Sequence, residues 1–261
     1  MKANKIWPRI FVYVLVTFSF TWVVALLIVL KVIPGYFHYA TGFGPLIGAF
    51  TLFLMDRQLW STIKELLVVK KPYWFWIGGL SPILLGALLM LVLKIIGYPS
   101  PSLSDIGKVS FLGDISFLVV PLWIFTFGLG EEFGWRGFLY PELKKKYSSL
   151  TATLILWVIW LAWHIPFFFY LPTYSNMNIG MIIGFAFSLL SGAILLNWLF
   201  EKSGRNLSTT ILWHGMFNLI TASAFGSGNI AMMLSMLVIF FSLAIFSSWV
   251  LPKAKVLNFL R

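Results

Sequence analysis

The sequence predicts an all-α protein, a polytopic membrane helical bundle of about eight transmembrane helices, with residues 1–261 forming a single transmembrane domain. The first supporting observation is composition: 60% of the residues are hydrophobic and 10% are charged, whereas soluble domains carry about 25% charged residues. The second is that apolar runs recur at the roughly 20-residue length that spans a bilayer. The third is that Lys and Arg lie mostly on one side of the membrane when the segments between spans are assigned to alternate sides.

The first predicted span follows a basic start. Lys2, Lys5 and Arg9 precede 21 uncharged residues at 10–30. A signal peptide has a shorter apolar core and a small-residue cleavage site, so we expect a retained helix at 10–32.

The first half of the chain continues with spans that alternate with turns and with one mixed segment. In the mixed segment, charged residues lie between apolar residues at a spacing of 3–4, which predicts an amphipathic helix in the membrane interface. The span after it opens with aromatic residues typical of an interfacial belt. The predicted elements are spans at 43–56 and 73–96, an interfacial helix at 56–72 and a polar loop at 97–113.

The second half of the chain contains longer apolar runs joined by short polar linkers. These linkers carry turn residues such as Gly, Pro, Ser and Asn. The predicted spans are 114–139, 149–170, 179–200, 206–225 and 229–251.

The basic residues predict the orientation of this bundle. When the segments between spans are assigned alternately to the two sides, 16 of the 19 Lys and Arg residues fall on one side, and Lys31, Lys94 and Lys108 on the other. Cytoplasmic loops carry the excess of Lys and Arg, so both termini are predicted to be cytoplasmic. The net charge of +11 therefore follows from topology, and nucleic acid is not an expected partner. The chain has no cysteine, which excludes a disulfide, a thiolate nucleophile and a Cys-based metal site.

Residues 128–140, GLGEEFGWRGFLY, place ionisable side chains at the end of an apolar run. Glu131 and Glu132 are two of only eight acidic residues in the chain, and burying such groups in hydrocarbon usually marks function. Glu132 and Arg136 are i,i+4 neighbours that can pair on a helix, whereas Glu131 points about 100° away. We therefore expect a Glu132–Arg136 pair, with Glu131 left free for chemistry near the cytoplasmic end of its helix.

Two other spans carry polar side chains at helical spacing. Trp160 and His164 share one helix face, and His214 and Asn218 share another. A carboxylate, two imidazoles and an amide can thus converge from three helices, which favours a functional site.

Structural interpretations of the same residues compete with this one. The Glu132–Arg136 pair has the form of an interfacial ion pair, and a membrane histidine often only bonds a neighbouring backbone group. His38 has the position of an interfacial residue among aromatics. Glu142 and Lys144–Lys146 form a run typical of a solvated, headgroup-facing surface. Glu201 and Arg205 are spaced to pair with each other.

The three polar motifs, taken in order, resemble those of the CPBP family. This family, also called Abi, comprises type II CAAX prenyl endopeptidases, their prokaryotic relatives, and bacteriocin-processing or immunity proteins. The resemblance covers about residues 112–225, with its motifs within 128–220. Trp160 stands where the family commonly has Phe, which we interpret as a tolerated aromatic replacement. The matching stretches are EEFGWR at 131–136, WLAWH at 160–164 and HGMFN at 214–218.

The resemblance implies an intramembrane glutamic-type endopeptidase whose site opens to the cytosol. By that analogy Glu131 and His164 activate a water, and His214 and Asn218 hydrogen-bond the oxyanion. The supporting residues would be Glu132, Arg136 and Trp160. The implied substrate is a membrane-associated or C-terminal peptide. No cofactor and no nucleic-acid partner are expected. The protein is expected in a prokaryotic cell membrane. The oligomeric state is not predicted.

Two alternatives stay open. Glu131, His164 and His214 form an ordinary catalytic zinc set, so a zinc-dependent version of the site is possible, although the chain has no HExxH motif. The second alternative is a non-catalytic immunity, peptide-binding or transport protein, since membrane carboxylates and histidines also serve proton relays. No inverted repeat typical of transporters is visible.

Overall fold

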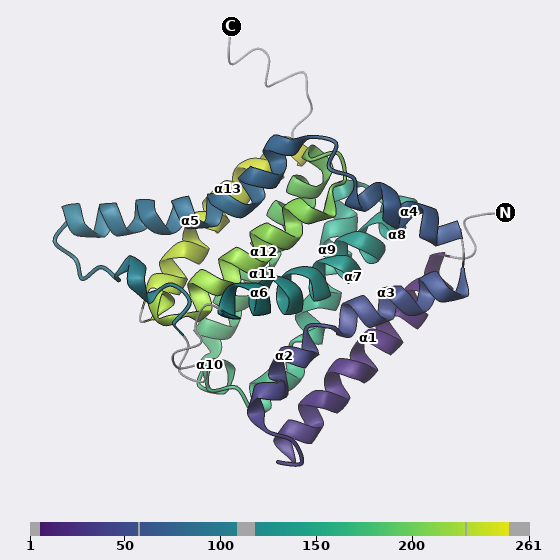
Figure 1. Cartoon of the computed structure of the whole chain (residues 1–261), viewed down its shortest axis with the longest axis horizontal. Helices are drawn as coiled ribbons and strands as arrows, with labels where there is room; N and C mark the ends of the chain where they lie inside the picture. The colour runs from purple at the N-terminus through teal and green to yellow at the C-terminus, as the bar shows by residue number, and fades with distance from the viewer. Residues whose placement is uncertain (1–5, 57, 109–117, 228, 251–261) are drawn as a thin grey trace, which may run out of the picture.

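A computed structural model describes residues 6–56, 58–108, 118–227 and 229–250, and these ranges contain helices and no strand (Figure 1). The predicted all-α class is confirmed. Three predictions fall partly outside the described residues: the start of the span at 114–139, the end of the loop at 97–113, and the position of the two chain ends. The cytoplasmic location of the termini stays a prediction.

Six helical segments in the described ranges are long and apolar enough to cross a membrane. Their bounds lie within a few residues of the predicted ones, except that the second segment begins earlier. It joins a turn (η2, Gly35–Phe37) and two helices, α2 (His38–Thr41) and α3 (Gly44–Met55). The predicted count of eight spans remains a prediction. The segments are Ile6–Val29 (α1), Gly35–Met55, Pro72–Ile95 (α5), Ser149–Phe169 (α9, Ser149–Trp163, with η7, Ile165–Phe169), Ile179–Lys202 (α11) and Ile230–Val250 (α13).

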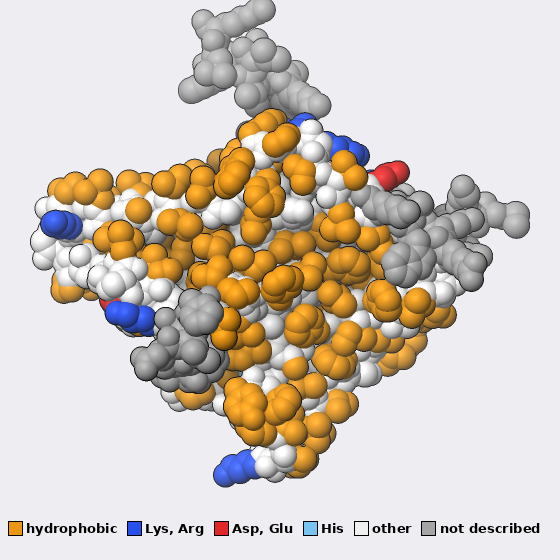
Figure 2. All heavy atoms as spheres, viewed as in Figure 1, with side chains coloured by type: hydrophobic (Ala, Val, Ile, Leu, Met, Phe, Trp, Pro, Cys, Tyr) orange, Lys and Arg blue, Asp and Glu red, His pale blue; other side chains and the backbone are white. Residues whose placement is uncertain are grey.

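The outer surface of the bundle is apolar. Figure 2 shows one face covered by hydrophobic side chains, with Lys and Arg confined to its margins. Phe11, Leu84 and Phe240 are 67%, 64% and 70% exposed, and apolar surface of this extent would not be left to water. The chain is therefore an integral multi-pass membrane protein.

The mixed segment predicted to be an amphipathic helix contains α4 (Gln58–Leu67), and its apolar side chains Ile63 and Leu66 are buried. The described part of the following polar loop holds a short helix, η3 (Leu103–Asp105), closed by a capping box between Ser102 and Asp105. The helix at 56–72 is thus confirmed, and its location in the membrane interface stays a prediction.

Two helices lie at the centre of the bundle and correspond to the two remaining predicted spans. The first is α12 (Leu207–Ala222), which packs on α5 (Figure 1). The second is a continuous helix from Val119 to Lys144, which we call the composite helix. Its parts are α6 (Val119–Trp123), η5 (Ile124–Glu131), α7 (Glu132–Gly134), η6 (Trp135–Leu139) and α8 (Tyr140–Lys144).

The composite helix corrects the predicted location of Glu131. The helix runs on to Lys144, so Glu131 lies 13 residues before its end, or roughly 20 Å at the α-helical rise. His164 lies 15 residues after the start of α9 at Ser149, which is a similar depth. Glu131 was predicted near the cytoplasmic end of its helix, and that prediction is wrong.

Local sequence signals fix where the other two site helices begin. Ser148 caps α9, with its hydroxyl accepting a hydrogen bond from the Thr151 N–H at 3.2 Å. Asn206 caps α12 in the same way through the Thr209 N–H at 3.3 Å. Such caps satisfy backbone donors that would otherwise lack partners at a helix start, so they hold the register of His164 and His214.

Close packing at two glycines holds the composite helix between its neighbours. A Cβ on Gly128 would lie 2.6 Å from the Ile211 carbonyl oxygen of α12, and one on Gly134 would lie 2.4 Å from Pro45 of α3. The stretches η5 and η6 are π-helical, a rare conformation that is frequently found at functional sites. The helix that carries both glutamates is thus wedged against two others by backbone contact.

We expect Gly134→Ala to lower the free energy of unfolding by about 1–3 kcal/mol, the usual cost of overpacking a core. The added methyl group meets Pro45 backbone and ring atoms that have no room to move. The matched control is Gly184→Ala in α11, where a Cβ meets nothing within 4 Å and alanine favours the helix. Thermal unfolding in detergent measures both variants, and an equal effect at the two positions would contradict the packing argument.

Candidate active site

Glu131 is a buried carboxylate, 3% exposed, whose Oε2 accepts two hydrogen bonds. One comes from the indole N–H of Trp135 at 3.1 Å, and the other from the indole N–H of Trp160 at 2.8 Å. Among the described residues, no hydrogen bond to Oε1 occurs. The prediction that Glu131 is left free therefore holds for one oxygen only.

Glu132 and Arg136 form the predicted i,i+4 ion pair. Both side chains are fully buried, and the Arg136 Nη1–H donates to Glu132 Oε1 at 2.7 Å. The same oxygen lies 2.8 Å from His214 Nδ1. One carboxylate oxygen thus joins a guanidinium and an imidazole, which links the composite helix to α12.

Two further residues extend this network, although Glu132 Oε2 and Arg136 Nη2 have no hydrogen-bond partner among the described residues. Neither of the two further residues was predicted from the sequence. Arg136 Nε–H donates to Asn197 Oδ1 at 2.9 Å, and Asn197 Nδ2–H donates to Thr153 Oγ1 at 2.8 Å. A buried polar network stabilises a unique packing only when its members have partners. Asn197 is an amide within a predicted span, and that was the one signal that could have identified it.

The two histidines each have one ring nitrogen engaged. His164 Nδ1 lies 2.7 Å from the Trp160 carbonyl oxygen. Because a carbonyl only accepts, Nδ1 carries the hydrogen, and the neutral ring keeps Nε2 as an acceptor. His214 Nδ1–H likewise donates to Glu132. Both rings therefore keep Nε2 for another partner.

Trp160 contacts both histidines, the arginine and one of the two glutamates of the site. Its ring centroid lies 5.6 Å from that of His214 and 6.0 Å from that of His164, and the Arg136 guanidinium lies 5.0 Å from the ring. Its N–H also binds Glu131. Trp160 thus adds a donor that phenylalanine lacks, and the interpretation of it as a tolerated aromatic replacement stays a prediction.

Asn218 lies one helical turn after His214 on α12 and is half-buried. In the described part of the chain its side chain makes no hydrogen bond, so its amide N–H groups have no competing acceptor there. The structure thus brings Glu131, His164 and His214 around Trp160, and Asn218 shares the helix face of His214.

His38 contacts aromatic residues that surround the site. Its Nδ1 lies 2.8 Å from the Tyr170 hydroxyl, and its ring packs edge-on against Phe167 at 4.9 Å. Phe167 in turn contacts His164 at 5.5 Å. His38 therefore lies among aromatic residues as predicted, and its location at the membrane interface stays a prediction.

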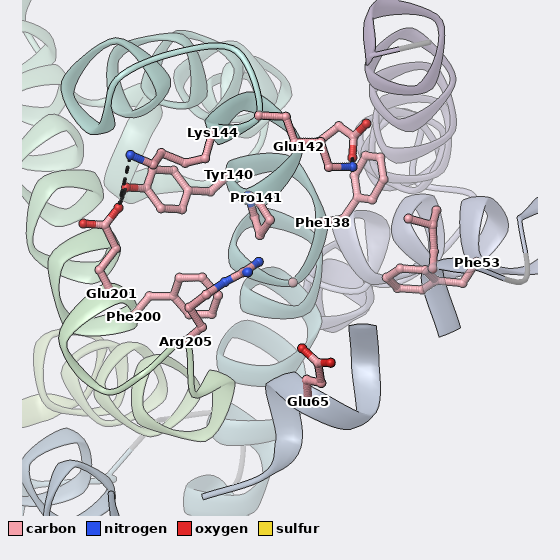
Figure 3. A pocket seen from close by; sticks show the side chains of 13 residues that line it. Phe53, Glu65, Phe138, Tyr140, Pro141, Glu142, Lys144, Phe200, Glu201 and Arg205 are labelled. Atoms are coloured by element: carbon pink, nitrogen blue, oxygen red, sulfur yellow. Dashed lines mark hydrogen bonds and ion pairs between the residues drawn. The ribbon is translucent and has the colours of Figure 1, made fainter. Parts of the chain in front are cut away.

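A separate cavity of about 420 Å³ lies beside α8, and none of the predicted site residues lines it (Figure 3). There Glu201 accepts from the Tyr140 hydroxyl at 2.5 Å and pairs with Lys144 at 3.6 Å. The predicted Glu201–Arg205 pair is not formed. Glu142 is 2% exposed and pairs with Lys145 and Arg9, so the prediction of a solvated Glu142 is also wrong.

The proposed zinc set does not converge as a metal site would. Among the described residues, no group of three His, Cys, Asp or Glu side chains is placed to hold a metal ion. One atom of each member is already engaged: Glu131 Oε2 by indoles, His164 Nδ1 by a carbonyl and His214 Nδ1 by Glu132. In the described part of the chain these bonds leave Glu131 Oε1, His164 Nε2 and His214 Nε2 open, and a metal-ligating histidine usually donates its other ring N–H in this way. The zinc-dependent version of the site therefore stays an untested alternative.

Comparison with known proteins covers the half of the chain that carries this site. Residues 113–220 match the family model described as type II CAAX prenyl endopeptidase Rce1-like. CAAX prenyl protease 2 of Methanococcus maripaludis is 29% identical over 126 residues, which is 44% of this chain and 45% of that protein. The chain therefore matches less than half the length of this relative. The matched region contains all three motifs, so the part of the chain that carries the site is similar to the type II CAAX prenyl endopeptidases of the CPBP family.

Proposed function

We propose that this protein is an intramembrane endopeptidase that hydrolyses a membrane-associated or C-terminal peptide at a site open to the cytosol, in a prokaryotic cell membrane. The observation that carries the proposal is Glu131, a buried carboxylate with one oxygen fixed and one oxygen without a hydrogen bond among the described residues. The relative named as a CAAX prenyl protease supports a peptide substrate.

The first chemical step follows from the atoms that keep a free lone pair. Glu131 Oε1 takes a proton from a water molecule, while His164 Nε2 accepts the other hydrogen of that water and orients it. The resulting hydroxide adds to the scissile carbonyl carbon. The proton held by Glu131 then passes to the amide nitrogen as the C–N bond breaks, which gives a carboxylic acid and a free amine. The carboxylic acid then releases its proton to solvent.

His214 and Asn218 stabilise the negative charge on the carbonyl oxygen in this proposal. Because His214 Nδ1–H already donates to Glu132, its Nε2 donates as well only in the imidazolium form. The Glu132 carboxylate beside the ring favours that form. Donors of this kind contribute about 2.7–4 kcal/mol each to acyl transfer, so Glu132 and Arg136 act by holding His214 charged and oriented.

The test uses the full chain in proteoliposomes with membrane peptides, prenylated and unprenylated at the C-terminus. In H₂¹⁸O, we expect cleavage at an internal peptide bond, with one ¹⁸O atom in the new carboxyl group detected by mass spectrometry. Absence of cleavage for every peptide would favour the non-catalytic peptide-binding, immunity or transport alternatives.

Metal removal separates the two hydrolytic mechanisms. The proposed steps need only Glu131 and imidazole groups. We therefore expect the cleavage rate with 1,10-phenanthroline or EDTA to stay within about twofold of the untreated rate. Removing a general base would lower the rate far more. A loss of cleavage that zinc restores would instead assign the zinc-dependent alternative.

A further inference from the structure

We infer that Trp135 and Trp160 are positioning residues whose indole N–H groups hold one oxygen of Glu131, so that the other oxygen serves as the base. This inference rests on the proposed function. The two donors lie 3.1 Å and 2.8 Å from the same atom, Oε2. They come from different elements, η6 and α9, so they fix the carboxylate from two directions.

Two donors on one carboxylate oxygen make the two oxygens unequal. Hydrogen bonds to an ionised oxygen occupy its lone pairs and stabilise negative charge on it. Oε2 is therefore the poorer proton acceptor, and Oε1 is the oxygen available to water. The clamp also restricts rotation about the last side-chain bond of Glu131, which would otherwise exchange the two oxygens.

Packing holds the indoles themselves in place. Trp135 is fully buried, with its ring centroid 5.8 Å from that of Tyr13 and 6.1 Å from that of Trp163. Trp160 contacts the Arg136 guanidinium and the His214 ring. A rotation of either indole would break these contacts, so the donors are oriented before a substrate binds.

Trp160 orients both members of the water-activating pair. Its indole N–H binds Glu131, and its main-chain carbonyl binds His164 Nδ1–H at 2.7 Å. One residue thus sets which oxygen of Glu131 and which nitrogen of His164 face the water. A phenylalanine at this position would keep the carbonyl contact and the ring, and would lose only the contact to Glu131.

The kinetic test compares variants that remove a single N–H donor. We expect Trp160→Phe and Trp135→Phe each to lower kcat about tenfold or more, the scale of a hydrogen bond to a charged group, with KM within about twofold. The matched control is Trp157→Phe, which removes an indole N–H from the same helix α9, bonded 2.9 Å away to the Ala186 carbonyl oxygen. That variant should keep the wild-type kcat. Wild-type kcat in Trp160→Phe, or a change in KM alone, would overturn the inference and leave the proposed function standing.

Two further measurements do not depend on a folded phenylalanine variant, and the second of them does not depend on cleavage. Benzothienylalanine at position 160 keeps the shape of tryptophan with sulfur in place of N–H, and we expect it to lower kcat as Trp160→Phe does. In chain labelled with ¹⁵N-tryptophan, the Nε1–H resonances of Trp135 and Trp160 should both shift in Glu131→Ala, while that of Trp157 stays. Unmoved Trp135 and Trp160 resonances would overturn the clamp, whether or not a peptide is cut. Shifted resonances with no cleavage by the wild-type chain would instead sink the proposed function alone.

Discussion

Replacing Glu131 by glutamine is expected to lower kcat/KM for peptide cleavage about a thousandfold, within the range that general-base catalysis contributes. Glutamine has almost the same shape, and its amide oxygen can still accept hydrogen bonds from Trp135 and Trp160. Its amide group has no basic site for the proton of water. The loss should therefore fall on the chemical step, and the variant should fold as the wild-type chain does.

The measurement is single-turnover cleavage in proteoliposomes, with thermal unfolding as the check on folding. Glu65→Gln is the matched control, because it makes the same change at an exposed glutamate that lines the separate cavity beside α8. That variant should cleave at the wild-type rate. If Glu131→Gln cleaves as fast as Glu65→Gln, Glu131 is not the base and the proposed mechanism fails.

The helices could be predicted from the sequence because their signals are local. Apolar runs set the ends of α5 at Pro72–Ile95 and α13 at Ile230–Val250, against predictions of 73–96 and 229–251. The composite helix was harder. The composite helix extends to Lys144 and has two π-helical stretches. In it, Gly128 and Gly134 make close contacts with helices elsewhere in the chain. No sequence pattern within the segment indicates such contacts.

The contacts of the site also divide into local ones that the sequence could predict and long-range ones that it could not. The Glu132–Arg136 pair follows from i,i+4 spacing, and the same spacing between Glu131 and Trp135 could have predicted the first indole contact. Trp160 reaches Glu131 across 29 residues and Asn197 reaches Arg136 across 61. Contacts at that separation depend on how helices pack, so the sequence could nominate these residues as polar members of spans without giving their partners.

Replacing Arg136 by methionine is expected to lower the free energy of unfolding by about 3–5 kcal/mol, the usual cost of removing one partner from a buried ion pair. Methionine fills much of the same volume, so the loss comes mainly from electrostatics. Glu132 would stay buried with His214 as its one partner, and Asn197 Oδ1 would lose its donor. Equilibrium unfolding in mixed detergent measures the change.

Lys108→Met is the matched control, because it removes the cation from an exposed pair with Asp105 at 2.9 Å. Exposed pairs contribute about 0–1 kcal/mol, so this variant should stay close to the wild-type chain. The double variant Glu132→Gln with Arg136→Met should be more stable than Arg136→Met alone, since it no longer buries an unpaired carboxylate. A double variant that is less stable than Arg136→Met would show that the ion pair is not what holds this part of the bundle.

The same double variant separates stability from catalysis. If Glu132 serves only the packing of the bundle, recovering stability should recover cleavage. If Glu132 holds His214 as a charged donor, as the 2.8 Å contact to Nδ1 suggests, a neutral glutamine cannot replace it. We therefore expect the double variant to regain stability and to remain at least tenfold slower than the wild-type chain, the scale of a lost hydrogen bond to a charged group. Such a result would assign the buried pair to the chemistry of His214, because packing alone would already have been restored.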